Sequence, residues 1–391
     1  MSDNAKKLIV LHTIRKIIDI FLGPFLTAYI FKISTDSITM VSLYNIFAYI
    51  VIAVFAFLVG CFIKNKYEMQ VFRIGMIAKF VQLIILTVLG EKIINYIWLV
   101  AIISGISTIT WYFPLNLFSS TLVEHKEKKE YIVYKTMISN IISVVLPVLF
   151  GTFISKDSFE RTTIIVLILS FIQIIFSFSL KYEKKPETYK FKLVETFKKL
   201  IKNKNVVELF KAELILGMTY EGALNTCVTL LIIMAFGHDF SLGVVTSIIS
   251  VLSIFSDYIC KRFINLNNLF KAIVISSIVP LLSTIVLLFV TNNYTIIAYN
   301  IIYTFFIQIV SITNDVKTMK LTNSKVINDS NRVEAFVLFE MFLGMGRIIS
   351  YILLLLVGLS KQQFLLNVLI IFLTICILWG GIHLTRVEVE Q

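Results

Sequence analysis

The chain alternates long apolar runs with short polar connections. Twelve runs are long enough to cross a bilayer as helices, which takes roughly 20 predominantly apolar residues. They cover residues 10–33, 38–63, 71–90, 94–123, 131–154, 162–181, 208–236, 241–264, 270–291, 294–317, 332–359 and 362–384. The pattern predicts an all-α membrane protein with twelve transmembrane helices.

The composition supports this prediction. Charged residues make up 15% of the chain, hydrophobic residues make up 58%, and the mean hydropathy is +0.88. Ordinary soluble domains do not have this balance. The first run continues past Phe31 without a small-residue cleavage site, so we interpret it as a retained span and not as a signal peptide.

The residues that usually carry metal or redox chemistry are few and dispersed. The four cysteines form no C-x-x-C pair and the four histidines form no H-E-x-x-H motif, which argues against disulfides, a metal site and a membrane metalloprotease. The predicted connections on one side are only a few residues long and could not hold the catalytic carboxylates of a membrane-bound transferase. We therefore expect no enzyme activity, no cofactor and no metal.

Basic residues gather on alternate connections. Of the 36 lysines and arginines, 30 lie on one side, including Lys64, Lys66, Arg73 and Lys79, which we assign to the turn between the second and third spans. The positive-inside rule then places both termini in the cytoplasm. The Ile, Lys, Asn and Phe bias suggests an AT-rich bacterial genome, so we expect a multi-pass protein of the bacterial inner (plasma) membrane. The net charge of +12 fits an anionic inner leaflet and does not require a nucleic-acid partner.

One connection, residues 181–208, is longer and more basic than the others. Apolar residues recur in it at helical spacing with lysines between them, which predicts an amphipathic helix on the inner membrane surface. We therefore expect a six-helix bundle at residues 1–181, a linker at 182–207 and a second six-helix bundle at 208–391.

Twelve spans, a basic linker between two sets of six and short outer turns resemble the major facilitator superfamily. The turn after the second span, "GCFIKNKYEMQVFR", keeps the glycine and basic residues of that family's G-x-x-x-D-R-x-G-R-R motif but lacks its acid. The matching turn "SDYICKRF" keeps an acid and two basic residues. The fifth span, "SVVLPVLFG", retains Pro147 and Gly151 of a motif typical of the antiporters. The resemblance implies gate residues at Gly60, Asp257, Lys261 and Arg262.

The resemblance also implies two pseudo-symmetric bundles that rock around a midplane site and give access to each side in turn. Helices 1, 4, 7 and 10 would line the cavity, whereas helices 3, 6, 9 and 12 would face lipid. The four runs in these lipid-facing places contain hardly any ionisable residue away from their ends, as lipid exposure requires. Such a protein is a secondary active transporter.

Glu221, in "GMTYEGALN" near the middle of the seventh run, is the first candidate for a coupling site. A charge in hydrocarbon costs several kcal/mol, about 3 on insertion scales. A carboxyl group partly stripped of water can take up and release a proton near neutral pH. The alternative is an acid held by a neighbouring helix in a purely structural role. Glu213 is expected at the cavity mouth and Glu334 in solvent.

Glu340 and Arg347 lie two turns apart on the eleventh run, roughly 10 Å along the helix axis, so we expect each to find its partner elsewhere. One hypothesis pairs Arg347 with Glu221 or Glu340 in one state and with an anionic group or nothing in the other; the alternative is a permanent ion pair. On the first run Arg15 and Asp19 are spaced to bridge each other near the cytoplasmic surface, and Asp19 is a further candidate coupling acid.

Aromatic and amide side chains suggest where a substrate could bind. Besides Arg347, the candidates are Trp111, Tyr112, Asn116, Tyr220, Asn225, Asn300, Tyr303 and Gln308. They suit a largely apolar or amphipathic molecule, although aromatic clusters of this kind also serve as plain packing. The leading hypothesis is proton-coupled export of a small amphipathic or hydrophobic compound by a monomer, with the lipid bilayer and protons as its other partners. Proton-symport nutrient uptake, flipping of a lipid-linked substrate and a non-transporting scaffold are the alternatives.

Overall fold

The computed structural model describes residues 1–121, 123, 127–180, 190–237, 239–263, 268–322, 324, 326–328 and 330–388. Every regular element within these residues is a helix. In chain order the elements are α1 (Asp3–Ile20), η1 (Phe21–Phe25), α2 (Leu26–Ile33), α3 (Ile38–Lys64), α4 (Glu68–Leu89), η2 (Gly90–Tyr96), α5 (Ile97–Thr121), α6 (Lys128–Lys156), α7 (Phe159–Ser177), α8 (Leu193–Leu200), α9 (Lys204–Met218), α10 (Ala223–Phe236), α11 (Asp239–Phe263), α12 (Leu269–Phe289), α13 (Asn293–Thr322), α14 (Arg332–Ser360) and α15 (Gln363–Arg386).

The predicted all-α membrane fold is confirmed. Among the described residues, 10 helical stretches are long and apolar enough to cross a membrane, and one of them, Glu68–Phe118, contains both α4 and α5. The continuous helical path of α1, η1 and α2 supplies the remaining span, although Arg15, Lys16 and Asp19 lower its hydropathy. These stretches account for the twelve runs seen in the sequence.

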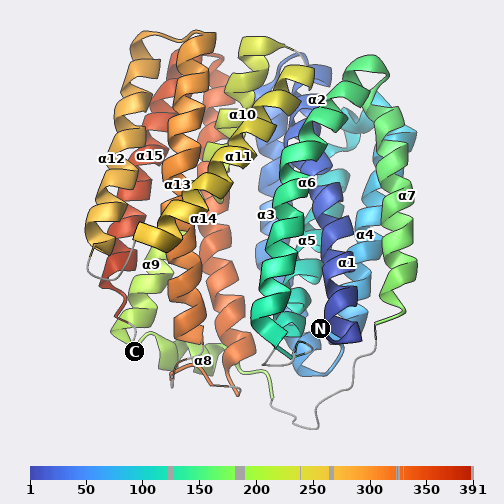
Figure 1. The fold of residues 1–391 in the computed structure, drawn as a ribbon, viewed down its shortest axis with the longest axis vertical. Helices are drawn as coiled ribbons and strands as arrows, with labels where there is room; N and C mark the ends of the chain where they lie inside the picture. Colours follow the sequence, from blue (N-terminus) through green and yellow to red (C-terminus); the bar gives the residue numbers. More distant parts are fainter. Residues whose placement is uncertain are drawn as a thin grey trace.

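The first six spans and the last six form two side-by-side groups (Figure 1). The most extensive packing between the groups joins α3 to α14 and α6 to α11. The start of α1 and the end of α15 lie at the same end of the molecule, where α8 also lies (Figure 1). We refer to this end as the terminus-bearing end and to the other as the opposite end.

Two spans are interrupted near the middle. A π-helical turn, η1, contains Pro24 and joins α1 to α2. The seventh run was expected to form one helix, and this expectation is wrong: α9 ends at Met218 and α10 begins at Ala223. The extended backbone of Gly222, with φ −120° and ψ −138°, turns the chain at this interruption.

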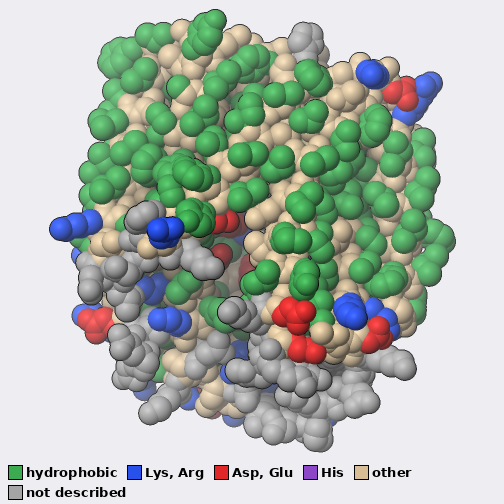
Figure 2. All heavy atoms as spheres, in the orientation of Figure 1, with side chains coloured by type: hydrophobic (Ala, Val, Ile, Leu, Met, Phe, Trp, Pro, Cys, Tyr) green, Lys and Arg blue, Asp and Glu red, His purple; other side chains and the backbone are tan. Residues whose placement is uncertain are grey.

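The outer surface of the bundle is hydrophobic. Figure 2 shows a band of apolar side chains over the helices, with charged side chains mainly toward the ends. Val54, Ile168 and Leu282 are each more than half exposed (58%, 56% and 59%), which soluble proteins avoid over contiguous areas. Lipid contact accounts for this surface.

Lys79 is an exception to the expected distribution of charge. The sequence count assigned it to a turn, but it lies in the middle of α4 and is only 3% exposed. The third span therefore carries an ionisable residue away from its ends, contrary to the expectation for a lipid-facing helix. The side chain is tolerated because it points into the protein and meets polar partners there.

Candidate functional site

A cavity of about 570 Å³ lies between the two groups of helices. Its walls come from both groups and include Asp19, Tyr44, Lys79, Glu221, Tyr303 and Tyr351. The volume falls in the range of small-molecule sites, which are clefts of roughly 300–1,000 Å³. Figure 2 shows that this face of the molecule is hollowed, with acidic side chains visible inside the hollow.

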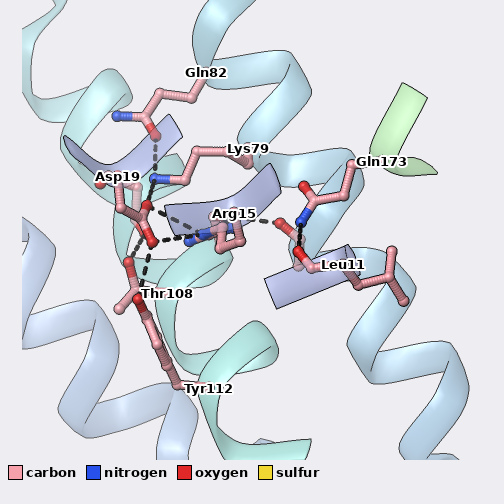
Figure 3. A network of polar contacts seen from close by, with 11 residues as sticks. Leu11, Arg15, Asp19, Lys79, Gln82, Thr108, Tyr112 and Gln173 are labelled. Carbon is pink, nitrogen blue, oxygen red and sulfur yellow. Dashed lines mark hydrogen bonds and ion pairs between the residues drawn. The ribbon is translucent and has the colours of Figure 1, made fainter. Parts of the chain in front are cut away.

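The wall from the first six spans is built around Asp19 (Figure 3). Arg15 Nε lies 3.0 Å from Asp19 Oδ2, which confirms the predicted i,i+4 pair. Arg15 is enclosed by the protein, because it is only 1% exposed. Lys79 Nζ lies 3.9 Å from Asp19 Oδ1, and the Tyr112 hydroxyl donates to Asp19 Oδ2 over 2.9 Å.

Further polar side chains hold these charges in place. Lys79 donates to Gln82 Oε1 at 3.0 Å, and Gln82 Nε2 donates to the Tyr44 hydroxyl at 3.2 Å. Arg15 Nη1 donates to Ser107 Oγ at 3.1 Å. The guanidinium also lies over the Trp111 ring, 5.3 Å from its centroid. A buried charge is tolerated when it is paired and hydrogen-bonded in this way.

The wall from the last six spans is built around Glu221, which lies in the interruption between α9 and α10. Arg347 on α14 donates through Nη2 to the Glu221 carboxylate at 2.7 Å and through Nε to the Glu221 carbonyl at 3.1 Å. A broken helix leaves carbonyl groups without intrahelical partners. Arg347 therefore satisfies both the charge and the backbone of the interruption.

Glu340 is a second carboxylate near Arg347. Its Oε2 lies 3.9 Å from Arg347 Nη1, so the expectation that these two residues could not meet is wrong. The two long side chains bridge the two-turn separation along α14. The Arg347 guanidinium also lies 5.2 Å from the ring centroid of Tyr49 on α3, a distance at which cation–π attraction operates. This contact joins the two groups of helices beside the cavity.

Small residues allow α9 and α14 to approach closely enough for these contacts. A Cβ atom at Gly346 would lie 2.0 Å from the Leu214 carbonyl oxygen, and one at Gly217 would lie 2.4 Å from the Leu343 carbonyl oxygen. Ser350 Oγ accepts a hydrogen bond from Ala223 N at 3.1 Å, which fixes the start of α10 against α14. Gly346 and Gly217 therefore lie at a contact that only small residues permit.

Several predicted substrate residues lie together beside Glu221. Asn225 Nδ2 donates to the Tyr220 carbonyl at 2.6 Å, and the Tyr303 hydroxyl donates to Asn225 Oδ1 at 3.0 Å. All three residues line the cavity. Asn300 is buried one turn away on α13, where its amide donates to the Ile296 carbonyl at 2.8 Å.

The other predicted substrate residues are placed differently. Trp111 is fully buried and stacks on Phe72, with ring centroids 4.5 Å apart. Tyr112 reaches Asp19, whereas Asn116 on the same helix is exposed. Gln308 on α13 is not among the residues that line the cavity.

At the terminus-bearing end, an ion pair that we did not predict from the sequence joins the two groups of helices. Glu334, expected in solvent, is only 1% exposed. Its Oε2 lies 2.8 Å from Lys64 Nζ, and its Oε1 accepts from Lys192 N at 3.1 Å. The contact joins α3, α14 and the segment before α8. The sequence did hold a signal for this pair. The turn after Gly60 keeps basic residues of the family motif, Lys64 among them, but lacks the motif's acid, so Lys64 needed an acidic partner from elsewhere in the chain.

Of the other predicted gate residues, Gly60 lies close to this ion pair. A Cβ atom at Gly60 would lie 2.6 Å from Val337 Cγ2, so α3 and α14 are in close contact there. Arg262 donates to the Tyr258 hydroxyl at 2.9 Å on the same helix. The side chain of Lys261 is outside the described residues.

At the opposite end, α6 and α11 close against each other. Lys32 Nζ lies 2.7 Å from Asp239 Oδ2, and Ser155 Oγ accepts from Phe240 N at 3.1 Å. A Cβ atom at Gly151 would lie 2.6 Å from the Asp239 carbonyl oxygen. Gly151 of the antiporter-like stretch is thus part of this closed contact.

Glu213, expected at the mouth of the cavity, is buried behind Glu221. Its Oε1 accepts from Thr318 Oγ1 at 3.1 Å and lies 3.4 Å from Asn314 Nδ2. Its surroundings are helix α13 and not the solvent-filled mouth.

The fold and the charged cavity define a multi-pass membrane transporter. A family model described as Major Facilitator Superfamily matches residues 8–350. The chain belongs to this superfamily, whose members act on small-molecule substrates within the membrane.

Comparison with individual proteins gives more distant similarity. The uncharacterized protein YqgE of Bacillus subtilis (strain 168) is 24% identical over 353 residues, which are 87% of this chain and 80% of that protein. A mutant of the nucleoside transporter NupG superposes with a TM-score of 0.73 at 13% identity, covering 98% of this chain and 100% of that chain. A bacterial homologue of the iron transporter ferroportin, in an inward-facing state, gives 0.68 at 10% identity, covering 99% and 100%. Identities this low show the fold alone.

Proposed function

We propose that the protein is a proton-coupled secondary transporter that exports a small amphipathic molecule by alternating access. The cavity between the two groups supports this proposal, because its hydroxyl, amide and aromatic groups suit a molecule with both polar and apolar parts. The contacts that join the groups at both ends are short-range and could break and reform as the groups rock.

The position of Glu221 is the observation that carries the proposal. Its side chain is 41% exposed and faces the cavity, yet it is paired with Arg347 at an interruption of the helix. A carboxylate of this kind can meet a proton from the aqueous cavity. Its protonation also has a structural consequence, because it removes the negative charge that holds Arg347.

Glu340 offers Arg347 a second partner. The Arg347 guanidinium lies 2.7 Å from Glu221 and 3.9 Å from Glu340, so a small side-chain movement exchanges one carboxylate for the other. When Glu221 is protonated, Arg347 turns toward Glu340 and releases the carbonyl at the helix interruption. This exchange couples a proton to the packing of α9 and α10 on α14. Asp19, already paired with Arg15 and Lys79, is the secondary candidate for a coupling acid.

The direction we propose is export. Pro147 and Gly151, which resemble part of the antiporter motif, lie at the crossing of α6 and α11, where a Cβ atom at Gly243 would lie 2.3 Å from the Pro147 carbonyl oxygen. We also propose that the protein acts as a monomer in the bacterial plasma membrane with both termini in the cytoplasm. The location of both chain ends at one end of the bundle and the bias of basic residues toward alternate connections support this orientation.

Everted membrane vesicles with an acidic interior test the function. Compounds from a panel of nutrients and antimicrobial agents are added while a pH-sensitive dye reports the gradient. For antiport export, a transported compound releases internal protons, so the fluorescence recovers; for symport uptake, the gradient is not relieved. We expect recovery with the wild-type protein and loss of that recovery in Glu221→Gln, which keeps the shape of the side chain but cannot carry the proton.

The control is Glu195→Gln, at a 71% exposed position on α8, which should behave as wild type. Full gradient-driven transport by Glu221→Gln would remove the coupling assignment. If neutralising Glu221, Glu340 and Arg347 together leaves the cellular function intact, the protein is a scaffold and not a transporter.

A further inference from the structure

The charges on the two walls of the cavity are unequal in number. On the wall from the first six spans, two cations, Arg15 and Lys79, share one carboxylate, Asp19. At the side of the last six spans, two carboxylates share one cation, Arg347: Glu221, which lines the cavity, and Glu340, which is not among the lining residues. One wall therefore has an excess positive charge and the other an excess negative charge.

Among the residues that the structure describes, the excess positive charge is not fully compensated. Lys79 lies at 3.9 Å from Asp19, a long distance for an ion pair, and its closer contact is with the neutral Gln82. Arg15 Nη2 is buried and has no hydrogen-bond partner among the described residues. Asp19 is already occupied by Arg15 Nε and the Tyr112 hydroxyl. Lys79 lines the cavity.

The excess negative charge is placed on the same cavity. Glu221 lines it, and its side chain is 41% exposed. Lys79 and Asp19 line the same cavity of about 570 Å³ as Glu221, so both walls can act on one small molecule.

We propose that the substrate is a small zwitterion, an aminocarboxylate or a molecule of equivalent charge, whose anionic group binds Lys79 and whose ammonium group binds Glu221. A ligand of one charge would leave the opposite wall uncompensated in a site of low dielectric, whereas a zwitterion satisfies both walls together. The tyrosine rings between them would contact its apolar part. This inference rests on the transport function proposed above and specifies its substrate class.

The test is equilibrium binding to purified full-length protein in detergent, measured as the rise in melting temperature that a ligand of the folded state produces. The probes are matched sets: α-, γ- and ε-amino acids with small, aliphatic and aromatic skeletons, the carboxamide of each, which is a cation, and the N-acetyl derivative of each, which is an anion. We expect stabilisation by members of the zwitterion set and at least about tenfold weaker binding of the two singly charged derivatives.

Two variants give an independent readout. Lys79→Gln should weaken binding of the zwitterion roughly thirtyfold while leaving the affinity for the matching carboxamide within about threefold. Glu221→Gln should also weaken binding of the zwitterion, but it should spare the affinity for the N-acetyl compound, which has no ammonium group. Hits confined to the cations or to the anions would overturn the inference, and so would the absence of any hit in the zwitterion set. Because binding needs no proton gradient, a protein that binds zwitterions without moving protons would refute only the coupling proposed above.

Discussion

Substitution of Lys64 by methionine tests whether the contact at the terminus-bearing end is a buried ion pair that holds α3 to α14. The Lys64 and Glu334 side chains are only 6% and 1% exposed. Methionine keeps much of the length and apolar surface of lysine but removes its charge. Glu334 would then keep the Lys192 backbone donor and lose the cation that lies 2.8 Å away.

The expected cost follows from this burial. Removing one partner of a buried pair leaves an uncompensated charge and costs about 3–5 kcal/mol. Glu334→Gln should cost less, about 1–3 kcal/mol, because the amide oxygen can still accept from Lys64 or from Lys192 N. The double variant Lys64→Met with Glu334→Gln buries no net charge, so it should be more stable than Lys64→Met alone.

Thermal unfolding in detergent measures these differences. An unfolding entropy of about 2.1 cal/mol/K per residue corresponds to roughly 0.8 kcal/mol/K for a chain of 391 residues. The melting temperature of Lys64→Met should therefore fall by at least about 4 °C. Helices that persist in the micelle lower the entropy of unfolding and make the shift larger. Lys202→Met, at an exposed position after α8, is the control and should change the melting temperature by less than about 1 °C. A shift in Lys64→Met as small as in this control, or a double variant less stable than both single variants, would refute the reasoning.

Two further predictions use the same assay. Gly346→Ala should destabilise by about 1–3 kcal/mol or more, because the added Cβ would lie 2.0 Å from the Leu214 carbonyl oxygen; Gly23→Ala, which meets nothing within 4 Å, should not, and equal losses in the two would show that close packing is not the cause. Lys32→Met should cost less than about 1 kcal/mol, because Lys32 and its partner Asp239 are 33% and 19% exposed; a loss as large as in Lys64→Met would show that burial does not decide the strength of these pairs.

The fold was predictable from the sequence because lipid imposes a simple local rule. A segment that crosses a bilayer must be apolar for about 20 residues and must satisfy its backbone internally, so hydropathy over a short window located the spans. The first run could still be recognised as a span although it contains Arg15 and Asp19. Charged residues occur in spans when they face away from lipid, so these two did not rule out a membrane helix. Hydropathy carries no information about helix breaks. The interruption between α9 and α10 was therefore not predicted, because it depends on close contact with α14.

The candidate site was predictable only in part. Glu221, Glu340, Arg347 and Asp19 were identified because a charge in an apolar run is costly and needs a reason. Lys79 was overlooked because it was assigned to a turn, and span boundaries are the least certain feature of a hydropathy pattern.

The sequence by itself determined the solvent of this protein, the number of its spans and most of the charges that the membrane must accommodate, because each follows from the local cost of polar groups in hydrocarbon. Tertiary structure alone decided which of those charges meet. Arg347 reaches Glu221 across 126 positions of the chain and Lys64 reaches Glu334 across 270. Such pairs depend on how helices pack in space, and Coulomb attraction falls with that spatial distance and not with separation along the sequence.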